Sequence, residues 1–191
     1  MPSGYTSGFE GRVLLDTGVV YYKKQGGDGN PTRLGVSVGG CTFEPGIEWR
    51  HIEFDGKRSD IEGLHRIVGR SGIIRGTFLI ELPKHIPIVE PGATEATNGG
   101  VTTWTPRAAS TLLTPNTEYL QDVRLVATKP DGTLVEVKFA RGLVTKWSWV
   151  QEDKNEHKLA DLEISAVLED GTAASSTDTA PYVYVERATI S

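Results

Sequence analysis

The chain has 191 residues, a length that suits one domain with a sizeable core, and its 22 glycines and 10 prolines favour short strands joined by turns. A formal net charge of −5 argues against a protein that grips nucleic acid through the phosphates. One cysteine and four scattered histidines without zinc-type spacing predict no disulfide, metal or cofactor. We see neither a signal peptide nor a run of about 18 apolar residues, so we expect no contact with a membrane.

The first segment that suggests chemistry is Asp16-Thr17-Gly18, which follows a short apolar run. Retropepsin-like aspartic proteases present their catalytic carboxylate in this way, and the "RIVGR" of 66–70 resembles the apolar-apolar-Gly segment found downstream in them. Their mechanism needs two carboxylates that share a proton, and a second Asp-Thr-Gly or Asp-Ser-Gly is absent here. A turn in which Asp16 bonds its own backbone and Gly18 takes a positive φ explains the same residues, so we favour the turn and no enzymatic activity.

Two segments further along have the alternation of half-buried strands, residues 46–56 and 73–82. In the first, the apolar residues change face midway, which predicts either a bulge near Arg50–His51 or cover on both faces. In the second, Ile74 and Phe78 share one face.

One helix is expected over residues 105–114. Thr105 is a good N-cap, Pro106 suits the first helical position, and Pro115 ends the pattern. The preceding segment, about 90–103, is rich in small and turn-forming residues and is predicted to be a mobile loop.

Residues 122–168 are predicted to form a four-stranded antiparallel meander. The turn "KPDGT" at 129–133 has Pro, Asp and Gly where a tight turn needs them, so it joins two strands as a hairpin. Residues 161–168 alternate cleanly between apolar and polar side chains. We therefore expect a mainly β domain over 1–170, followed by a linker and an arm strand, "YVYVER", within 171–191.

The run "LGVSVGGCTFEPGIEWRHIEFDGKRSDIEGLHRI" (34–67), the strand "IIRGTFLIEL" and the segment from "DVRLVATKPDG" to "LEISAVLED" resemble the major tail proteins of long-tailed bacteriophages. The resemblance spans most of residues 11–170. It implies a β-sandwich or barrel-like core with one short flanking α-helix.

The same resemblance implies a structural virion protein, made in the host cytoplasm and located in the tail. Hexameric rings of it would stack into the tube through which DNA passes during ejection, and a tape measure protein and a tail terminator protein would be its partners. The inner tube of a contractile tail or injection system is an alternative within the same class. Unpaired edges of a strand-rich chain independently favour joining to copies of itself.

Three groups of residues are candidates for function. Self-assembly contacts are expected at Phe43, Pro45, Trp49, Arg50, Phe54, Lys57, Tyr182 and Tyr184. A channel that passes DNA should repel phosphate, so acidic residues are expected to line it, and the candidates are Glu48, Glu53, Glu136 and Glu163. Trp147 and Trp149 project together from one strand and suggest a core or an interface, or alternatively a platform for a sugar.

Overall fold

Antiparallel strands make up most of the chain that the structure, a computed structural model, describes: residues 18–23, 29–51, 65–80, 82–114, 118–151, 157–168 and 180–187. The strands are β1 (Val19–Lys23), β2 (Thr32–Arg33), β3 (Val36–His51), β4 (His65–Leu79), β5 (Thr94–Asn98), β6 (Val101–Thr105), β7 (Leu120–Thr128), β8 (Leu134–Gln151), β9 (His157–Val167) and β10 (Tyr182–Arg187). The helix α1 spans Leu82–Val89. The prediction of a mainly β fold with one short helix is confirmed.

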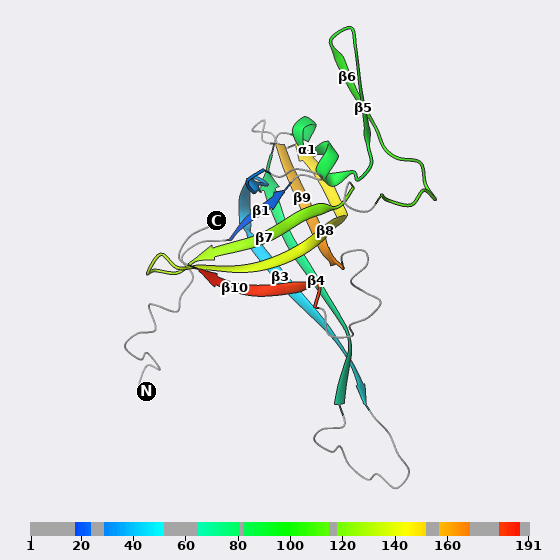
Figure 1. Cartoon of the computed structure of the whole chain (residues 1–191). Helices are drawn as coiled ribbons and strands as arrows, with labels where there is room; N and C mark the ends of the chain where they lie inside the picture. Colours follow the sequence, from blue (N-terminus) through cyan, green and yellow to red (C-terminus); the bar gives the residue numbers. More distant parts are fainter. Residues whose placement is uncertain are drawn as a thin grey trace.

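Strand β8 joins two groups of strands that cross each other in Figure 1. The main sheet has the order β2-β1-β7-β8-β9-β4-β3, and β10 also pairs with β8. The first part of β8, up to Gly142, pairs with β7, while its second part, from Arg141 onward, pairs with β9. β10 pairs with residues Leu134–Phe139 of β8.

The two ends of this sheet lie close together, because only Leu34 and Gly35 separate β2 from β3. The Ser37 hydroxyl of β3 donates a hydrogen bond of 3.1 Å to the carbonyl oxygen of Gly18, just before β1. Among the described strands no ladder pairs β3 with β1 or β2. The sheet therefore curls back towards itself and is held there by side chains and a short connection.

The core fills the inside of this curl. Strands from both groups contribute, and the helix adds two residues from its last turn; the largest fully buried apolar side chains are Phe78, Phe139, Leu34, Ile74, Leu159, Leu162 and Ile164. The faces predicted for 73–82 and 161–168 are confirmed at Ile74, Phe78, Leu162 and Ile164, which are all buried. Leu168, which follows the end of β9, is 40% exposed and does not join the core.

The predicted hairpin at 129–133 is confirmed, but the meander has three strands instead of four. The amide of Lys129 donates to the carbonyl of Thr133 at 2.8 Å, and Gly132 has a φ of 83°. The strand after this turn does not end near 140, because β8 continues unbroken to Gln151. Glycine at position 142 allows β8 to pass through the core without a break. A Cβ there would lie 2.8 Å from a methyl of Val123 and 3.0 Å from one of Ile164, which is too close for a side chain to fit.

The helix is not where the sequence pattern placed it. Residues 106–114 are not helical, and Thr105 instead pairs with Thr94 at the end of a hairpin. The helix occupies 82–89, although Pro87 lies inside it and removes one backbone hydrogen-bond donor.

The predicted mobile loop at 90–103 is also wrong, because most of it forms the hairpin of β5 and β6 (Figure 1). Gly99 and Gly100 have φ values of 58° and 80°, which is the requirement of the tight two-residue turn that joins such strands. The exposed, threonine-rich strands on either side lack the apolar alternation by which a half-buried strand is recognised.

A bulge is present in the first alternating segment, slightly before its predicted place. The pairing of β3 with β4 shifts between Glu48 and Trp49, and Val68 is the extra residue on β4. Ile52 and Phe54, which motivated the prediction, lie outside the described residues, as does the linker of 171–179.

We predict that Gly142→Ala lowers the free energy of unfolding by about 1–2 kcal/mol, because the new methyl must displace Val123 and Ile164 in a packed core. Urea unfolding followed by circular dichroism measures this. Gly29→Ala is the matched control, since nothing lies within 4 Å of a Cβ at that exposed position. Equal stability of the two variants would contradict this view of the β8 crossing.

Candidate assembly surfaces

The longest hairpin of the molecule extends beyond the body as an arm (Figure 1). β9 pairs with β4 only from Ile73 onward, so residues 65–72 of β4 are held by β3 alone. At about 3.3 Å per residue, these eight residues extend roughly 25 Å. We call residues 45–51 and 65–72 the β3–β4 arm.

One face of the arm continues the apolar side of the core into solvent. Phe43 points into the body, and the next residues on its side of β3 are Pro45, Ile47 and Trp49. Ile67 joins them, since it pairs directly with Trp49 across the two strands. The exposed fractions of Ile47 and Trp49 are 42% and 58%. We call Pro45, Ile47, Trp49 and Ile67 the apolar stripe.

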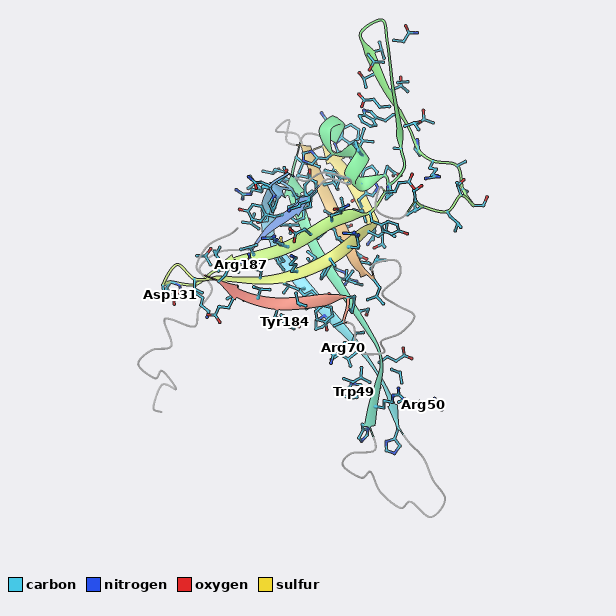
Figure 2. All side chains as sticks on the ribbon, viewed as in Figure 1. Trp49, Arg50, Arg70, Asp131, Tyr184 and Arg187 are labelled. Carbon is cyan, nitrogen blue, oxygen red and sulfur yellow. The ribbon has the colours of Figure 1, made fainter. Side chains whose placement is uncertain are left out.

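Aromatic side chains connect the base of the apolar stripe to the C-terminal strand. The Phe43 ring lies 5.0 Å from that of Tyr182 and 5.9 Å from that of Tyr184, both in edge-to-face geometry, and 6.0 Å from Phe139. Tyr182 is buried, but 63% of Tyr184 is exposed. Figure 2 shows Tyr184, Arg70 and Trp49 following one another from the body toward the end of the arm.

On the face of the sheet opposite Phe43 and Tyr182, a cluster of charged side chains holds the C-terminal strand β10 in place. Glu136 on β8 is fully buried, and it accepts a hydrogen bond of 3.0 Å from Nη2 of Arg187 on β10. Nε of Arg187 lies 2.5 Å from the second carboxylate oxygen of Glu136, and Nη1 of the buried Arg124 is 4.0 Å from Glu136. Removal of either arginine would leave a buried negative charge with less compensation.

The cluster continues through Asp122, which Arg124 binds with two parallel hydrogen bonds of 2.6 and 2.9 Å. Lys138 is 3.0 Å away on β8. Burial by itself would raise the pKa of Asp122, but the hydrogen bonds from Arg124 and Lys138 outweigh it and lower that pKa to about 2. The five charged groups therefore connect β7, β8 and β10.

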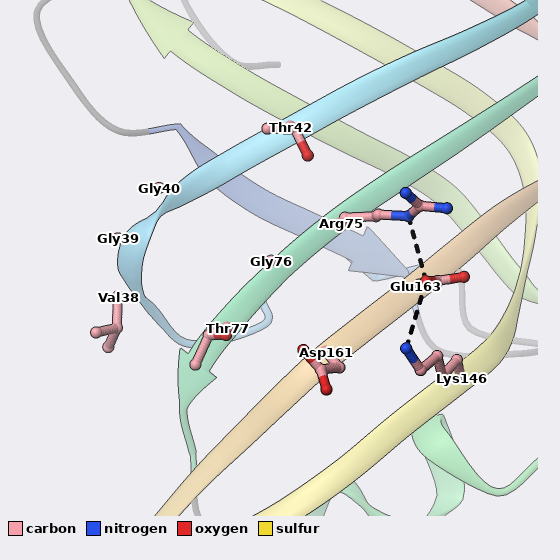
Figure 3. A pocket seen from close by; sticks show the side chains of 10 residues that line it. All are labelled: Val38, Gly39, Gly40, Thr42, Arg75, Gly76, Thr77, Lys146, Asp161 and Glu163. Atoms are coloured by element: carbon pink, nitrogen blue, oxygen red, sulfur yellow. Dashed lines mark ion pairs between the residues drawn. The ribbon is translucent and has the colours of Figure 1, made fainter.

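A second charged row crosses the outer face of β3, β4, β9 and β8. Nε of Arg75 is 3.2 Å from Glu163, and Lys146 is 3.9 Å from the same carboxylate. Arg75 also forms a 2.9 Å ion pair with Glu44. Arg75, Glu163 and Lys146, together with Asp161, line a shallow pocket of about 260 Å³ beside Gly39 and Gly40 (Figure 3). The opposite charges are matched within the row, so the pocket does not select a cation or an anion.

The predicted assembly residues fall into three situations. Phe43, Tyr182 and Tyr184 meet within one chain, because β10 pairs with β8 of its own molecule, whereas the sequence suggested an arm that joins a neighbour. Pro45 and Trp49 belong to the apolar stripe, and Arg50 lies on the opposite face of β3. Phe54 and Lys57 lie outside the described residues.

Of the three predicted channel residues that the structure describes, Glu136 and Glu163 are paired with opposite charges. Glu136 is buried and paired with arginines, which removes it from any channel wall. Glu163 is neutralised by Arg75 and Lys146. Glu48 is exposed on the arm, and Glu53 lies outside the described residues.

Two other predictions concern binding or catalysis. Trp147 is half-buried and donates a 3.1 Å hydrogen bond to Glu90, whereas Trp149 is 52% exposed, so the two indoles do not form one open platform. Gly18 has the expected positive φ of 82°, but Asp16 lies outside the described residues.

Sequence reasoning missed the charged cluster. The sequence suggested Glu136 as a channel residue, and the pairing of Glu136 depends on Arg187, which is 51 residues away in the chain. The available signal was local: Asp122 and Arg124, and likewise Glu136 and Lys138, are opposite charges two residues apart on neighbouring strands.

Compared with known proteins, the sequence matches no protein-family model and no curated protein. Within the described ranges, no three His, Cys, Asp or Glu side chains gather closely enough to hold a metal ion. The same part of the chain contains no helix with the length and apolar character needed to cross a membrane.

We predict that Glu136→Gln lowers the free energy of unfolding by about 2–4 kcal/mol, because Arg187 and Arg124 lose a buried counter-charge. Glu186→Gln is the matched control. Glu186 lies on β10 and is also an ion-paired carboxylate, with Lys129 as its partner, but its side chain is 60% exposed. We therefore expect its substitution to lower the free energy of unfolding by less than about 0.5 kcal/mol. Guanidinium unfolding at neutral pH compares the two; similar losses would contradict the role given to the charged cluster.

We further predict that the contribution of Asp122 to the free energy of unfolding depends on pH. Its folded pKa of about 2 lies below the value of about 3.9 for an unfolded chain, so its contribution is present above pH 4–5 and is lost as the pH falls through about 2. Asp122→Asn should therefore cost about 1–2 kcal/mol at pH 7, and the gap from the wild type should narrow below pH 4. A gap that stays constant between pH 7 and pH 2.5 would exclude this.

Proposed function

We propose that this chain is the subunit of a tube built from stacked rings of identical copies, as the resemblance to phage major tail proteins implies. The observation that carries the proposal is the apolar stripe on the β3–β4 arm. An arm with large apolar side chains exposed along one face is stabilised when a second surface covers that face. Within the single chain, Ile47 and Trp49 are 42% and 58% exposed.

The open strands of the sheet support the same proposal. β3 is the last strand of the main sheet, with β4 as its one ladder partner among the described strands, and β10 pairs only with β8. Such unpaired edges associate with other strands unless they are protected. Contact between two different surfaces of identical chains is head-to-tail, and it closes into a ring when the rotation fits.

The arrangement of the arms suits contacts in two directions. In Figure 1 the β3–β4 arm and the β5–β6 hairpin extend from the body on opposite sides. The second hairpin is also exposed along its length, with Val101 at 66%. In the proposed assembly the β3–β4 arm contacts a copy on one side of the subunit, within the ring or in the ring beneath it. The β5–β6 hairpin contacts a copy on the opposite side of the subunit.

The proposed channel is one that DNA traverses without being held. The chain's net charge of −5 is consistent with weak contact with phosphate. Since Glu136 and Glu163 are internally paired, the proposal does not depend on them as channel charges, and Glu48 is the remaining described candidate. The tape measure and tail terminator proteins are the partners that this function brings with it, and the virion tail is the location.

We predict that the double substitution Ile47→Ser and Trp49→Ser abolishes assembly without unfolding the subunit. Both side chains are largely exposed in the single chain, so circular dichroism and the urea midpoint should change little. Negative-stain microscopy and sedimentation velocity of concentrated protein measure assembly. Leu112→Ser is the matched control, since Leu112 is 89% exposed and lies off both arms.

Two results would count against the proposal in different ways. Normal rings or tubes from the double variant would remove the apolar stripe from the interface. Wild-type protein that stays monomeric at high concentration over a wide range of salt would remove the tube itself.

A further inference from the structure

The outer end of the β3–β4 arm carries two histidines that face each other. His51 on β3 and His65 on β4 are direct cross-strand partners, the last pair that the ladder forms. Their Nδ1 atoms are 3.4 Å apart, and the ring centroids are 4.7 Å apart. We propose that His51 and His65 form a two-histidine site for a divalent first-row transition metal ion such as Ni²⁺, Cu²⁺ or Zn²⁺.

The separation of the two nitrogens fits such an ion. Imidazole nitrogens bind zinc at about 2.0–2.1 Å, and a tetrahedral angle of about 109° between two such bonds sets the nitrogens about 3.3–3.4 Å apart. The observed 3.4 Å therefore needs little change in the separation of the two nitrogens, and each ring turns so that its Nδ1 lone pair points at the ion. In the metal-free pair one Nδ1 donates its hydrogen to the other. On binding, that ring takes the tautomer with its hydrogen on Nε2, so both Nδ1 lone pairs point at the ion and no net proton is released.

The strand pairing makes the site a chelate. Directly opposite residues of two paired strands are held side by side, so binding one imidazole brings the second to the same ion with little further loss of freedom. The next pair toward the body on the other face is Arg50 with Arg66, and alternation directs these guanidinium groups away from the histidines. On the same face the neighbouring pair is Trp49 with Ile67.

The two imidazole nitrogens determine which class of metal ion can bind, and they occupy only two of its coordination positions. Two neutral imidazoles suit Zn²⁺, Cu²⁺ and Ni²⁺, whereas Ca²⁺ and Mg²⁺ require oxygen ligands. Among the described residues, no third His, Cys, Asp or Glu completes a metal-binding group here. This site is independent of ring assembly and is measurable on the dilute chain.

The test is calorimetric titration of untagged protein with NiCl₂ and with ZnCl₂ at pH 7.5. We expect saturable binding of one ion per chain and no heat from CaCl₂. Because even the outer-shell partners of metal ligands contribute about 10–100-fold in affinity, His51→Asn and His65→Asn should each weaken binding by at least about tenfold. His85→Asn, in helix α1, is the matched control and should bind like the wild type.

A second measurement locates the ion. Trp49 lies two residues from His51 on the same face, so bound Cu²⁺ should quench the fluorescence of Trp49. The quenched component should disappear in Trp49→Phe, while calorimetry on that variant still shows binding. Circular dichroism of the histidine variants verifies that the arm and the body remain folded. Equal affinity of the wild type and His51→Asn, or absence of saturable binding by the wild type, would overturn the proposal.

Discussion

The buried carboxylate of Glu136 determines how the end of the chain joins the rest of the fold. A fully buried charge is tolerated only when it is paired, and its partners come from two strands, Arg187 of β10 and Arg124 of β7. Shifting β10 by one residue against β8 would turn Arg187 to the opposite face and leave Glu136 without it. The ion pair therefore selects one register for the C-terminal strand, even if its net contribution to stability is small.

That register has consequences on the apolar side of the sheet. With Arg187 directed to the charged face, Tyr182 and Tyr184 fall on the other face, where both rings contact Phe43. Phe43 is at the base of the β3–β4 arm, so the C-terminal strand supports the point from which the arm extends. Loss of β10 would remove the buried Tyr182 from the core together with this support, which is a stronger effect than the loss of a detachable tail.

Features set by neighbouring residues were predictable from the sequence, and features set by distant contacts were not. The turn at 129–133 and the buried face of Leu162 and Ile164 depend on local turn chemistry and alternation, and both were correct. The helix was misplaced because Thr105 and Pro106 resemble a helix start, while the pairing of Thr105 with Thr94 overrides that signal. Glu136 was assigned to the channel wall because the sequence alone cannot place Arg187 beside it. Phe43 and Tyr182 were chosen for their aromatic character, and the structure brings them together inside one molecule.

The β3–β4 arm offers its side chains more readily than its backbone for association. Pro45 lacks the amide hydrogen that strand addition uses, and proline is a common means of protecting an edge strand. The like-charged pair of Arg50 and Arg66 opposes close stacking of a second arm on that face. On the face of the apolar stripe, Arg70 pairs directly with Ile47, whereas Trp49 and Ile67 form an uncharged pair. A surface of this kind favours packing against a different surface of another copy, and contacts between unlike surfaces are the ones that propagate into rings and tubes.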